Sequence, residues 1–251
     1  IFFMIGLIGG TGIDKIKDVE ILRQDDINTP YGRPSEKLSF LSYDNHEFIF
    51  LPRHGESHSI PPHKINYRAN IWALKKIGVE QVFSIATVGA IDRKVKPGDI
   101  VIPDQIIDYT YGREHTFFDG DLKPVEHIDF TYPFSEELRS KIINLAKKLK
   151  INLIESGTYA SVQGPRLESA AEIDRYKKDG ASIVGMTCMP EAALAKELGL
   201  EYFVVCPAVN YAAGRADSKK ELSHETIVAN SEKIMTKVFN LFINFLRNNA
   251  D

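Results

Sequence analysis

The strand–helix–strand pattern of residues 185–210 constrains the fold of this chain most strongly. We expect an apolar strand to end at Thr187 and a helix to start at Pro190, because proline suits the first helical position. Gly199 ends that helix, and a second apolar strand follows and ends on the amide of Asn210. Ligands of α/β folds collect at the carboxyl ends of strands, so this hydroxyl and this amide are candidate binding groups. The alternative is an ordinary strand–helix–strand unit with chance polar residues.

Apolar runs alternate with helical patterns along the rest of the chain, which predicts an α/β fold with a mixed, partly parallel sheet. The expected strands are Met4–Ile8, Leu38–Ser42, Glu47–Leu51, Gln81–Ala86, Asp99–Pro103, Ser182–Met186 and Tyr202–Ala208. The expected helices are Ile65–Lys76, a helix capped by Ser135, and His224–Arg247. The stretch Asp104–Pro133 lacks periodicity and is expected to be a long loop that covers a site or reaches a neighbouring subunit.

Composition excludes several classes of protein. The 251 residues are 43% hydrophobic with a net charge of −3, which allows one sizeable core and gives no sign of nucleic-acid binding. We find no apolar run of membrane length and no signal peptide, and Cys188 and Cys206 are interpreted as reduced thiols. We therefore expect one cytoplasmic domain over residues 1–251, with Ile1–Phe3 not native and Met4 as the natural start.

A glycine-rich turn, Gly9-Gly-Thr-Gly12, follows the first expected strand. Glycines let a backbone approach an anion closely, and the hydroxyl of Thr11 adds a donor. The turn is neither a Walker loop nor a good dinucleotide fingerprint, because Lys15 stands where the third glycine belongs. A tight structural turn is the alternative.

A basic pair, Arg53-His54, directly follows the expected strand at 47–51. Arginine binds phosphate with a planar fork, and a neighbouring histidine adds a donor that can be charged. Together with Thr11 and Thr187, this pair predicts one anion pocket built from distant parts of the chain.

These motifs occur in an order that resembles a known family. The ordered motifs are Gly9-Gly-Thr-Gly12, Arg53-His-Gly55, Asn66-Tyr-Arg-Ala-Asn-Ile-Trp-Ala-Leu74, Lys96-Pro-Gly-Asp-Ile-Val101, Gly164-Pro-Arg166 and Met186-Thr-x-Met-Pro-Glu191. The chain resembles the trimeric class of purine nucleoside phosphorylases from about residue 4 to about residue 245. Within it, the chain is most similar to the branch of methylthioadenosine and methylthioinosine phosphorylases.

The resemblance implies a single domain with a central mixed, partly barrel-like sheet flanked by helices. It implies a pentosyltransferase that cleaves the N-glycosidic bond of a purine nucleoside with inorganic phosphate as co-substrate. No metal and no organic cofactor are expected, because positioning and electrostatics supply most of the barrier reduction in this reaction. A homotrimer is expected, with no nucleic-acid or membrane partner.

The resemblance also assigns roles to residues. Matching positions bind phosphate (Thr11, Arg53, His54, Thr87, Thr187), pack under the ribose (Met186), contact the base (Asn210, Leu167) and close a neighbour's 5'-pocket (His127). His54 and Asn210 are the expected catalytic residues. Leu167 stands where relatives often place a phenylalanine against the base, and Glu168 after it is interpreted as a helix-start carboxylate or as a contact to base or backbone.

Residue 210 determines the expected substrate. An asparagine amide can donate to a 6-oxo group, whereas the adenine-type relatives carry Asp-x-Asp where this chain has Asn210-Tyr-Ala212. The run Ile60-Pro-Pro-His63 resembles the methylthio branch. S-Methyl-5'-thioinosine reconciles both signals, and inosine or guanosine and S-methyl-5'-thioadenosine are the alternatives.

Two other classes of function remain as alternatives at this point. A Rossmann-type redox enzyme is disfavoured by the missing third glycine and by the absence of a clear ribose-binding acid after a second strand. A non-catalytic nucleoside sensor is disfavoured by the intact Arg53, His54, Thr187 and Asn210.

Overall fold

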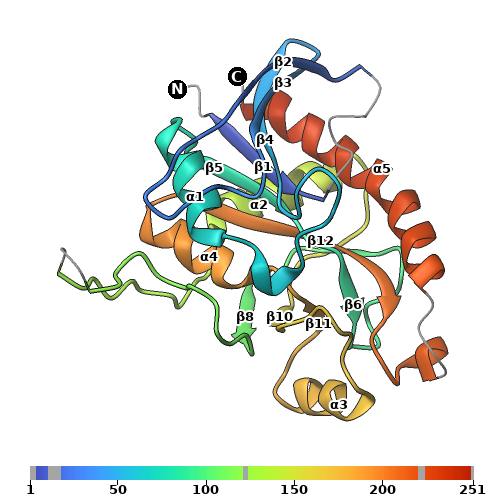
Figure 1. Cartoon of the computed structure of the whole chain (residues 1–251). Helices are drawn as coiled ribbons and strands as arrows, with labels where there is room; N and C mark the ends of the chain where they lie inside the picture. Colours follow the sequence, from blue (N-terminus) through green and yellow to red (C-terminus); the bar gives the residue numbers. More distant parts are fainter. Residues whose placement is uncertain (1–3, 11–17, 121–123, 220–223, 250–251) are drawn as a thin grey trace.

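The computed structural model describes residues 4–10, 18–120, 124–219 and 224–249, and Figure 1 shows their arrangement. The strands are β1 Ile5–Gly9, β2 Glu20–Asp25, β3 Leu38–Tyr43, β4 His46–Pro52, β5 Gln81–Ile85, β6 Val88–Ala90, β7 Ile100–Val101, β8 Gln105–Asp108, β9 Leu153–Ile154, β10 Thr158–Ser161, β11 Ile183–Gly185 and β12 Glu201–Tyr211. The helices are η2 Pro62–Lys64, α1 Tyr67–Lys76, α2 Glu136–Lys148, α3 Ala170–Lys178, α4 Cys188–Glu197, η3 Ala216–Lys219 and α5 His224–Asn249.

One mixed sheet of 12 strands organises the molecule, with the main order β2-β3-β4-β1-β5-β12-β6-β11-β10-β8. Strands β4, β1, β5 and β12 are mutually parallel, so their carboxyl ends meet at one edge. This sheet confirms the expected mixed α/β fold.

Strand β12 connects the parts of the sheet. Its first half pairs with β5, residues Cys206 and Pro207 pair with β7, and its last part pairs with β6. The register shifts between Ala208 and Asn210, which marks a bulge or irregularity of the kind that re-aims side chains beside functional sites.

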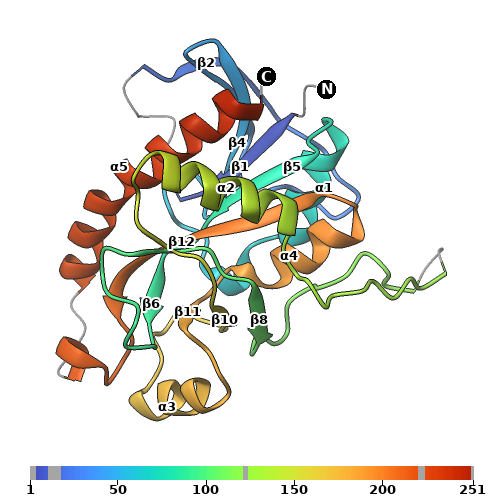
Figure 2. The ribbon, with the colours of Figure 1, turned by 180° about the vertical axis from the view of Figure 1, so that it is seen from behind.

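Helices cover both faces of this sheet. Helices α1 and α4 pack against each other, and α2 packs against α5. Figure 2, seen from behind, shows α2 in front of β5 and β12, while α1 and α4 lie on the face towards the viewer in Figure 1. The sequence explains the helix starts, since Ser135 accepts a hydrogen bond from the Leu138 amide and caps α2 as predicted.

Aromatic packing fixes α5 on the sheet. Phe83 of β5 contacts Phe242 and Phe245 of α5, and Phe203 of β12 contacts Phe245, with ring centroids 5.1 to 5.6 Å apart. All four side chains are at most 2% exposed. Each such pair stabilises by roughly 0.5–1.5 kcal/mol beyond its buried area.

The structure differs from the expected elements in several places. Helix α1 begins at Tyr67 rather than Ile65, because the side chain of Asn66 accepts a hydrogen bond from the Ala69 amide. Helix α4 begins at Cys188, two residues before Pro190, although Met189 keeps extended dihedral angles. The sequence patterns did not predict β2, β6, β8, β9, β10 or α3.

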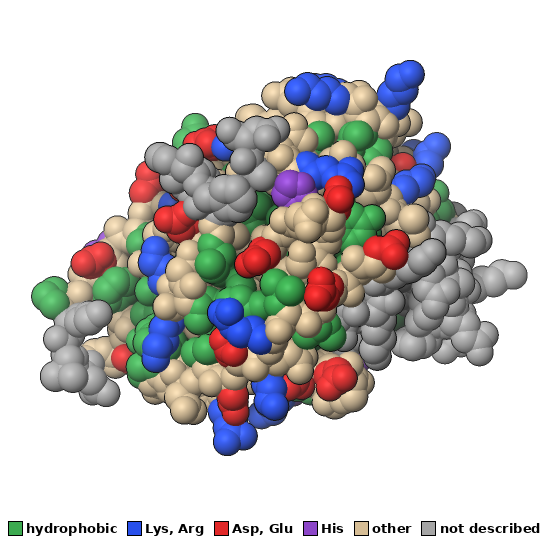
Figure 3. Space-filling model, turned by 90° about the horizontal axis from the view of Figure 1, so that it is seen from above, with side chains coloured by type: hydrophobic (Ala, Val, Ile, Leu, Met, Phe, Trp, Pro, Cys, Tyr) green, Lys and Arg blue, Asp and Glu red, His purple; other side chains and the backbone are tan. Residues whose placement is uncertain are grey.

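The stretch 104–133 is only partly the expected loop. It begins with β8, and the following residues form an arm that extends away from the rest of the molecule in Figures 1 and 2. Figure 3 shows acidic and basic side chains intermixed on the face seen from above. The structure describes no helix long and apolar enough to cross a membrane.

Candidate active site

The candidate site lies where several strand ends meet. Arg53 follows β4, and its amide donates to the carbonyl of Gly9 at the end of β1 (2.9 Å). Thr87 lies between β5 and β6, which both run parallel to β12, and its side chain is exposed. Thr11, the expected hydroxyl of the glycine-rich turn, lies outside the described residues.

Strand β11 leads to Met186 and Thr187, two further residues of the candidate site. It runs antiparallel to β6, and Gly89 pairs with Val184 on one side and Asn210 on the other. Continued past the ends of β11 and β6, this register places position 186 opposite position 87. The register therefore brings together residues from three segments that are more than 20 positions apart.

Arg53 is almost completely buried, with 1% of its surface exposed. Its Nε and Nη2 donate to the two carboxylate oxygens of Glu191 (2.6 and 2.8 Å), Nη2 also donates to Ser84 Oγ (2.7 Å), and Nη1 donates to the carbonyl of Ile85 (2.9 Å). Burial opposes the charged form, but Glu191 outweighs it and raises the pKa of Arg53. Four of the five N–H donors have acceptors among the described residues, and the fifth has none among them.

Glu191 is the centre of this network. Its side chain is fully buried and also accepts hydrogen bonds from Ser84 Oγ and Tyr202 Oη, both at 2.8 Å. In the sequence, Glu191 was named only as the last residue of the motif that begins at Met186. Its partner Arg53 is 138 positions away, so no local pattern could have revealed the pair.

His54 is held as a neutral ring. Its Nδ1 lies 2.8 Å from the carbonyl oxygen of Ile60, and its ring stacks on His58 with centroids 4.4 Å apart. Burial, followed by the charge of Arg53, lowers the pKa of His54 to about 4. Because a carbonyl only accepts, Nδ1 carries the proton of the neutral ring and Nε2 is an acceptor.

Met186 and Thr187 form the turn between β11 and α4. The Met186 sulfur occupies the space that a side chain on Gly164 would need, and Gly164 has a φ of +59°, which favours glycine. Thr187 is 7% exposed and stands at the N-cap of α4 without a side-chain capping bond. Its hydroxyl therefore does not cap its own helix.

Asn210 is half-buried near the end of β12. Its Nδ2 donates to the carbonyl of Tyr211 (2.7 Å) and lies 3.3 Å from the position that a Cβ on Gly89 would occupy. An amide nitrogen carries two N–H donors, so one is held by the backbone and the other can serve a ligand.

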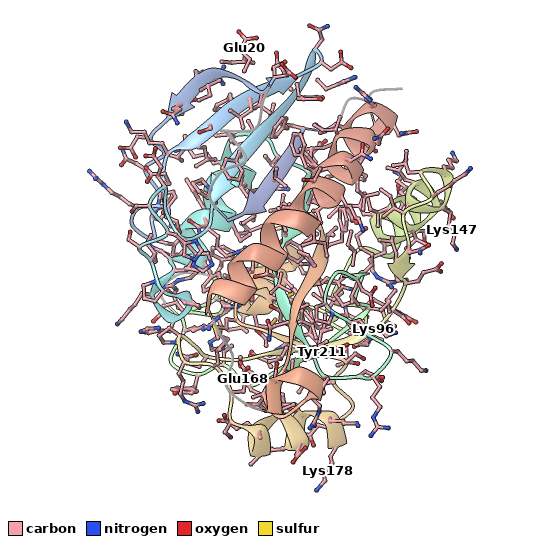
Figure 4. The ribbon with its side chains drawn as sticks, turned by 90° about the vertical axis from the view of Figure 1, so that its right-hand side faces the viewer. Glu20, Lys96, Lys147, Glu168, Lys178 and Tyr211 are labelled. Atoms are coloured by element: carbon pink, nitrogen blue, oxygen red, sulfur yellow. The ribbon has the colours of Figure 1, made fainter. Side chains whose placement is uncertain are left out.

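Leu167 and Glu168 lie in the turn between β10 and α3. Leu167 is 44% exposed, and burial raises the pKa of the Glu168 carboxyl. Figure 4 shows Glu168 at the same end of the molecule as Tyr211 and α3. The contact of Gly164 with Met186 links this turn to the rest of the site.

His127 is not brought to the other site residues of this chain. Its side chain is exposed on the arm, and within the described part of the chain no hydrogen bond or ion pair joins it to them. The described residues also contain no group of three His, Cys, Asp or Glu side chains that could hold a metal ion.

Arg113, on the arm, was missed by sequence reasoning. Its guanidinium is 8% exposed and donates to the carbonyl of Met186 (2.8 Å) and to that of Gln163 (2.8 Å). It thus joins the arm to both turns of the site. The sequence signal for it was absent, because the surrounding stretch is polar and aperiodic.

Comparison with known proteins shows the family of this chain. A model of the phosphorylase superfamily matches residues 4–247. A probable S-methyl-5'-thioinosine phosphorylase of Pseudomonas syringae pv. tomato is 48% identical over 210 residues, which cover 84% of this chain and 85% of that protein. A 6-oxopurine nucleoside phosphorylase of Pyrococcus furiosus is 43% identical over 244 residues, which cover 95% of this chain and 90% of that protein.

The fold is also similar to that of a solved nucleoside phosphorylase structure. Methylthioadenosine phosphorylase from Schistosoma mansoni, in complex with adenine, superposes with a TM-score of 0.92 at 29% identity, covering 98% of this chain and 91% of that chain. The family resemblance drawn from the ordered motifs is confirmed. The chain therefore belongs to the phosphorylase superfamily, among its purine nucleoside phosphorylases.

Proposed function

We propose that this enzyme cleaves the N-glycosidic bond of S-methyl-5'-thioinosine with inorganic phosphate. The products are hypoxanthine and 5-methylthioribose 1-phosphate. A phosphate oxygen bonds to the anomeric carbon, and the electron pair of the broken bond leaves on the purine, which takes up a proton. The observation that carries the proposal is Asn210, an amide near the end of β12 that pairs with Gly89 of β6.

The phosphate-binding end combines hydroxyl groups with one guanidinium donor. Arg53 offers its remaining N–H, and Thr187 and Thr87 offer hydroxyls at neighbouring strand ends. Neutral His54 accepts through Nε2, so it suits a phosphate oxygen that carries a proton. The hydroxyl of Thr11 would be a further donor at the phosphate-binding end of the site.

Asn210 is the base-binding residue in this proposal. Its free N–H can donate to the 6-oxo group, or its amide can serve N7 as negative charge develops on the leaving purine. Met186 packs under the ribose and Leu167 lies towards the base. The relatives named for methylthioinosine and for 6-oxopurine nucleosides support a 6-oxo substrate.

The 5'-group is expected to matter less than the base. A buried methyl contributes only about 1 kcal/mol, and an apolar pocket rarely excludes a hydroxyl strongly. Inosine should therefore remain a detectable substrate. Inosine or guanosine and S-methyl-5'-thioadenosine are the alternative preferred substrates.

We also propose a homotrimer in which His127 of one subunit closes the 5'-pocket of the next. The arm supports this assembly because it exposes Tyr111, Val125 and Tyr132 at 72%, 58% and 59%. The buried free thiols of Cys188 and Cys206 suit a reducing compartment, so we place the enzyme in the cytoplasm.

The test is a substrate panel measured with and without phosphate. Methylthioinosine, methylthioadenosine, inosine, guanosine and adenosine are each incubated with enzyme, and free base is quantified. We expect base release only with phosphate, fastest for methylthioinosine, and unchanged by EDTA because no cofactor is proposed. Full-rate release in phosphate-free buffer would indicate a hydrolase, and loss of activity in EDTA restored by one divalent ion would indicate a metal-dependent reaction.

A further inference from the structure

The guanidinium of Arg113 has an acceptor for each of its donors. The two N–H groups of Nη1 are shared among three acceptors, the carbonyls of Met186 (2.8 Å) and Met189 (2.6 Å) and Tyr67 Oη (3.1 Å), whose own hydroxyl donates to a backbone carbonyl. Nη2 donates to the carbonyls of Val162 (3.2 Å) and Gln163 (2.8 Å), and Nε donates to Gln163 Oε1 (3.2 Å). A single buried side chain therefore satisfies four backbone carbonyls.

Three of those carbonyls belong to the two turns of the candidate site, and that of Met189 belongs to the start of α4. One turn follows β10 and leads through Gly164 towards Leu167, and the other follows β11 and carries Met186 and Thr187. The planar fork of arginine fixes both turns at once, which a lysine ammonium does not reproduce. Arg113 therefore sets the relative position of the base side and the phosphate side.

The charge of Arg113 is not neutralised by a neighbour. All six of its acceptors are uncharged oxygens, and it forms no ion pair with a carboxylate in the part of the chain that the structure describes. Arg53, by contrast, is paired with Glu191, so that pair has no net charge. His54 adds no charge either, because its pKa lies at about 4.

We propose that Arg113 is a positioning residue of the site, and that its charge supplies positive potential for the phosphate co-substrate. It fixes the position of the Met186–Thr187 turn relative to the turn after β10. Its cation lies close to the Thr187 amide, because Nη1 donates to the Met186 carbonyl of the same peptide group. This inference rests on the proposed phosphorolysis.

The test compares Arg113→Met and Arg113→Lys with Arg139→Met. Arg139 is the control for the loss of a buried arginine, since it is 6% exposed and donates to the carbonyls of Pro103 (2.8 Å) and Glu155 (2.8 Å) without contacting the site, although it is also paired with Glu136. The phosphate KM, the nucleoside KM, kcat and Tm are measured for each variant. Phosphate binding is measured separately as the rise in Tm on adding inorganic phosphate.

We expect Arg113→Met to raise the phosphate KM by about tenfold or more, to lower kcat and to lose the phosphate-induced rise in Tm. Arg113→Lys should recover phosphate affinity because it keeps the charge, but not kcat, because it cannot hold both turns. Arg139→Met should lower Tm and leave the phosphate KM as in wild type. Wild-type constants in Arg113→Met would overturn the inference.

Gln163→Glu covers the case in which Arg113→Met does not fold. It places a carboxylate opposite Nε, so it neutralises the charge while keeping the fork in place. We expect a higher phosphate KM with an unchanged or higher Tm, and an unchanged phosphate KM would overturn the inference. Activity of the wild type without phosphate would instead overturn the proposed function, so the two failures are distinguishable.

Discussion

The buried pair of Arg53 and Glu191 determines what arginine can do at this site. Removing a charge from water is costly, and the pair is tolerated because Ser84, Tyr202 and the carbonyl of Ile85 complete its hydrogen bonds. An arginine held in this way presents a fixed donor rather than a mobile charge. In the proposed function, phosphate recognition at Arg53 therefore depends on the geometry of this donor.

We expect Glu191→Gln to lower the free energy of unfolding by about 3–5 kcal/mol, because it leaves a buried guanidinium unpaired. Denaturant unfolding measures this change. Glu137→Gln is the control, because Glu137 is an exposed partner of Lys141 and its loss should change stability by less than about 1 kcal/mol. Equal effects of the two substitutions would contradict the role of the buried pair.

At the scale of elements, the turns that follow β10 and β11 are interlocked. Gly164 adopts a positive φ, and Met186 fills the space where its side chain would be. Met186, which we propose packs under the ribose, is thus held by a neighbouring turn rather than by its own strand.

We expect Gly164→Ala to displace Met186 and to lower kcat/KM for the nucleoside by roughly tenfold or more, because misplaced positioning groups are costly in rate. Gly180→Ala is a matched control, since Gly180 has a φ of +98° and nothing lies within 4 Å of the position that a Cβ would occupy there. Both should lose about 1–2 kcal/mol of stability from backbone strain. A kinetic effect of equal size in both variants would show that strain alone, and not Met186, is responsible.

The strength of the apolar pattern in each element determined whether the sequence alone could predict it. Periodicity and capping residues predicted α1, α2 and the strands at the centre of the sheet, because these carry strong apolar patterns. Short strands such as β6 and β9 have two or three residues, too few for any pattern. Strand β2 is almost wholly exposed, so its pairing with β3 leaves no apolar alternation.

The site was predictable only where its residues follow strands. Arg53, Thr187 and Asn210 stand at strand ends or near them, and the family resemblance pointed to the same positions. Glu191 and Arg113 were not predictable, because their roles depend on partners far away in the sequence and on burial. Hydrogen bonds between buried charges and distant residues produce no recognisable pattern in the neighbouring sequence.

At the scale of the whole molecule, one sheet brings the proposed phosphate, ribose and base positions together around β12. Its carboxyl half pairs with β6, which in turn pairs with β11, so a change of one side chain on β12 should alter substrate choice without altering the fold. Asn210 is that side chain, since it is half-buried and borders Gly89.

The most direct test compares kcat/KM for methylthioinosine, methylthioadenosine and inosine on wild type and on Asn210→Asp. A carboxylate only accepts hydrogen bonds, so it should disfavour a 6-oxo group and favour a 6-amino group. One such contact in a desolvated pocket is worth roughly 1–3 kcal/mol, or about ten- to a hundredfold in the ratio of 6-oxo to 6-amino turnover. We predict that wild type prefers methylthioinosine and that the substitution lowers this ratio by that factor. A wild-type preference for methylthioadenosine, or an unchanged ratio in Asn210→Asp, would contradict the assignment of Asn210 as the residue that reads the base.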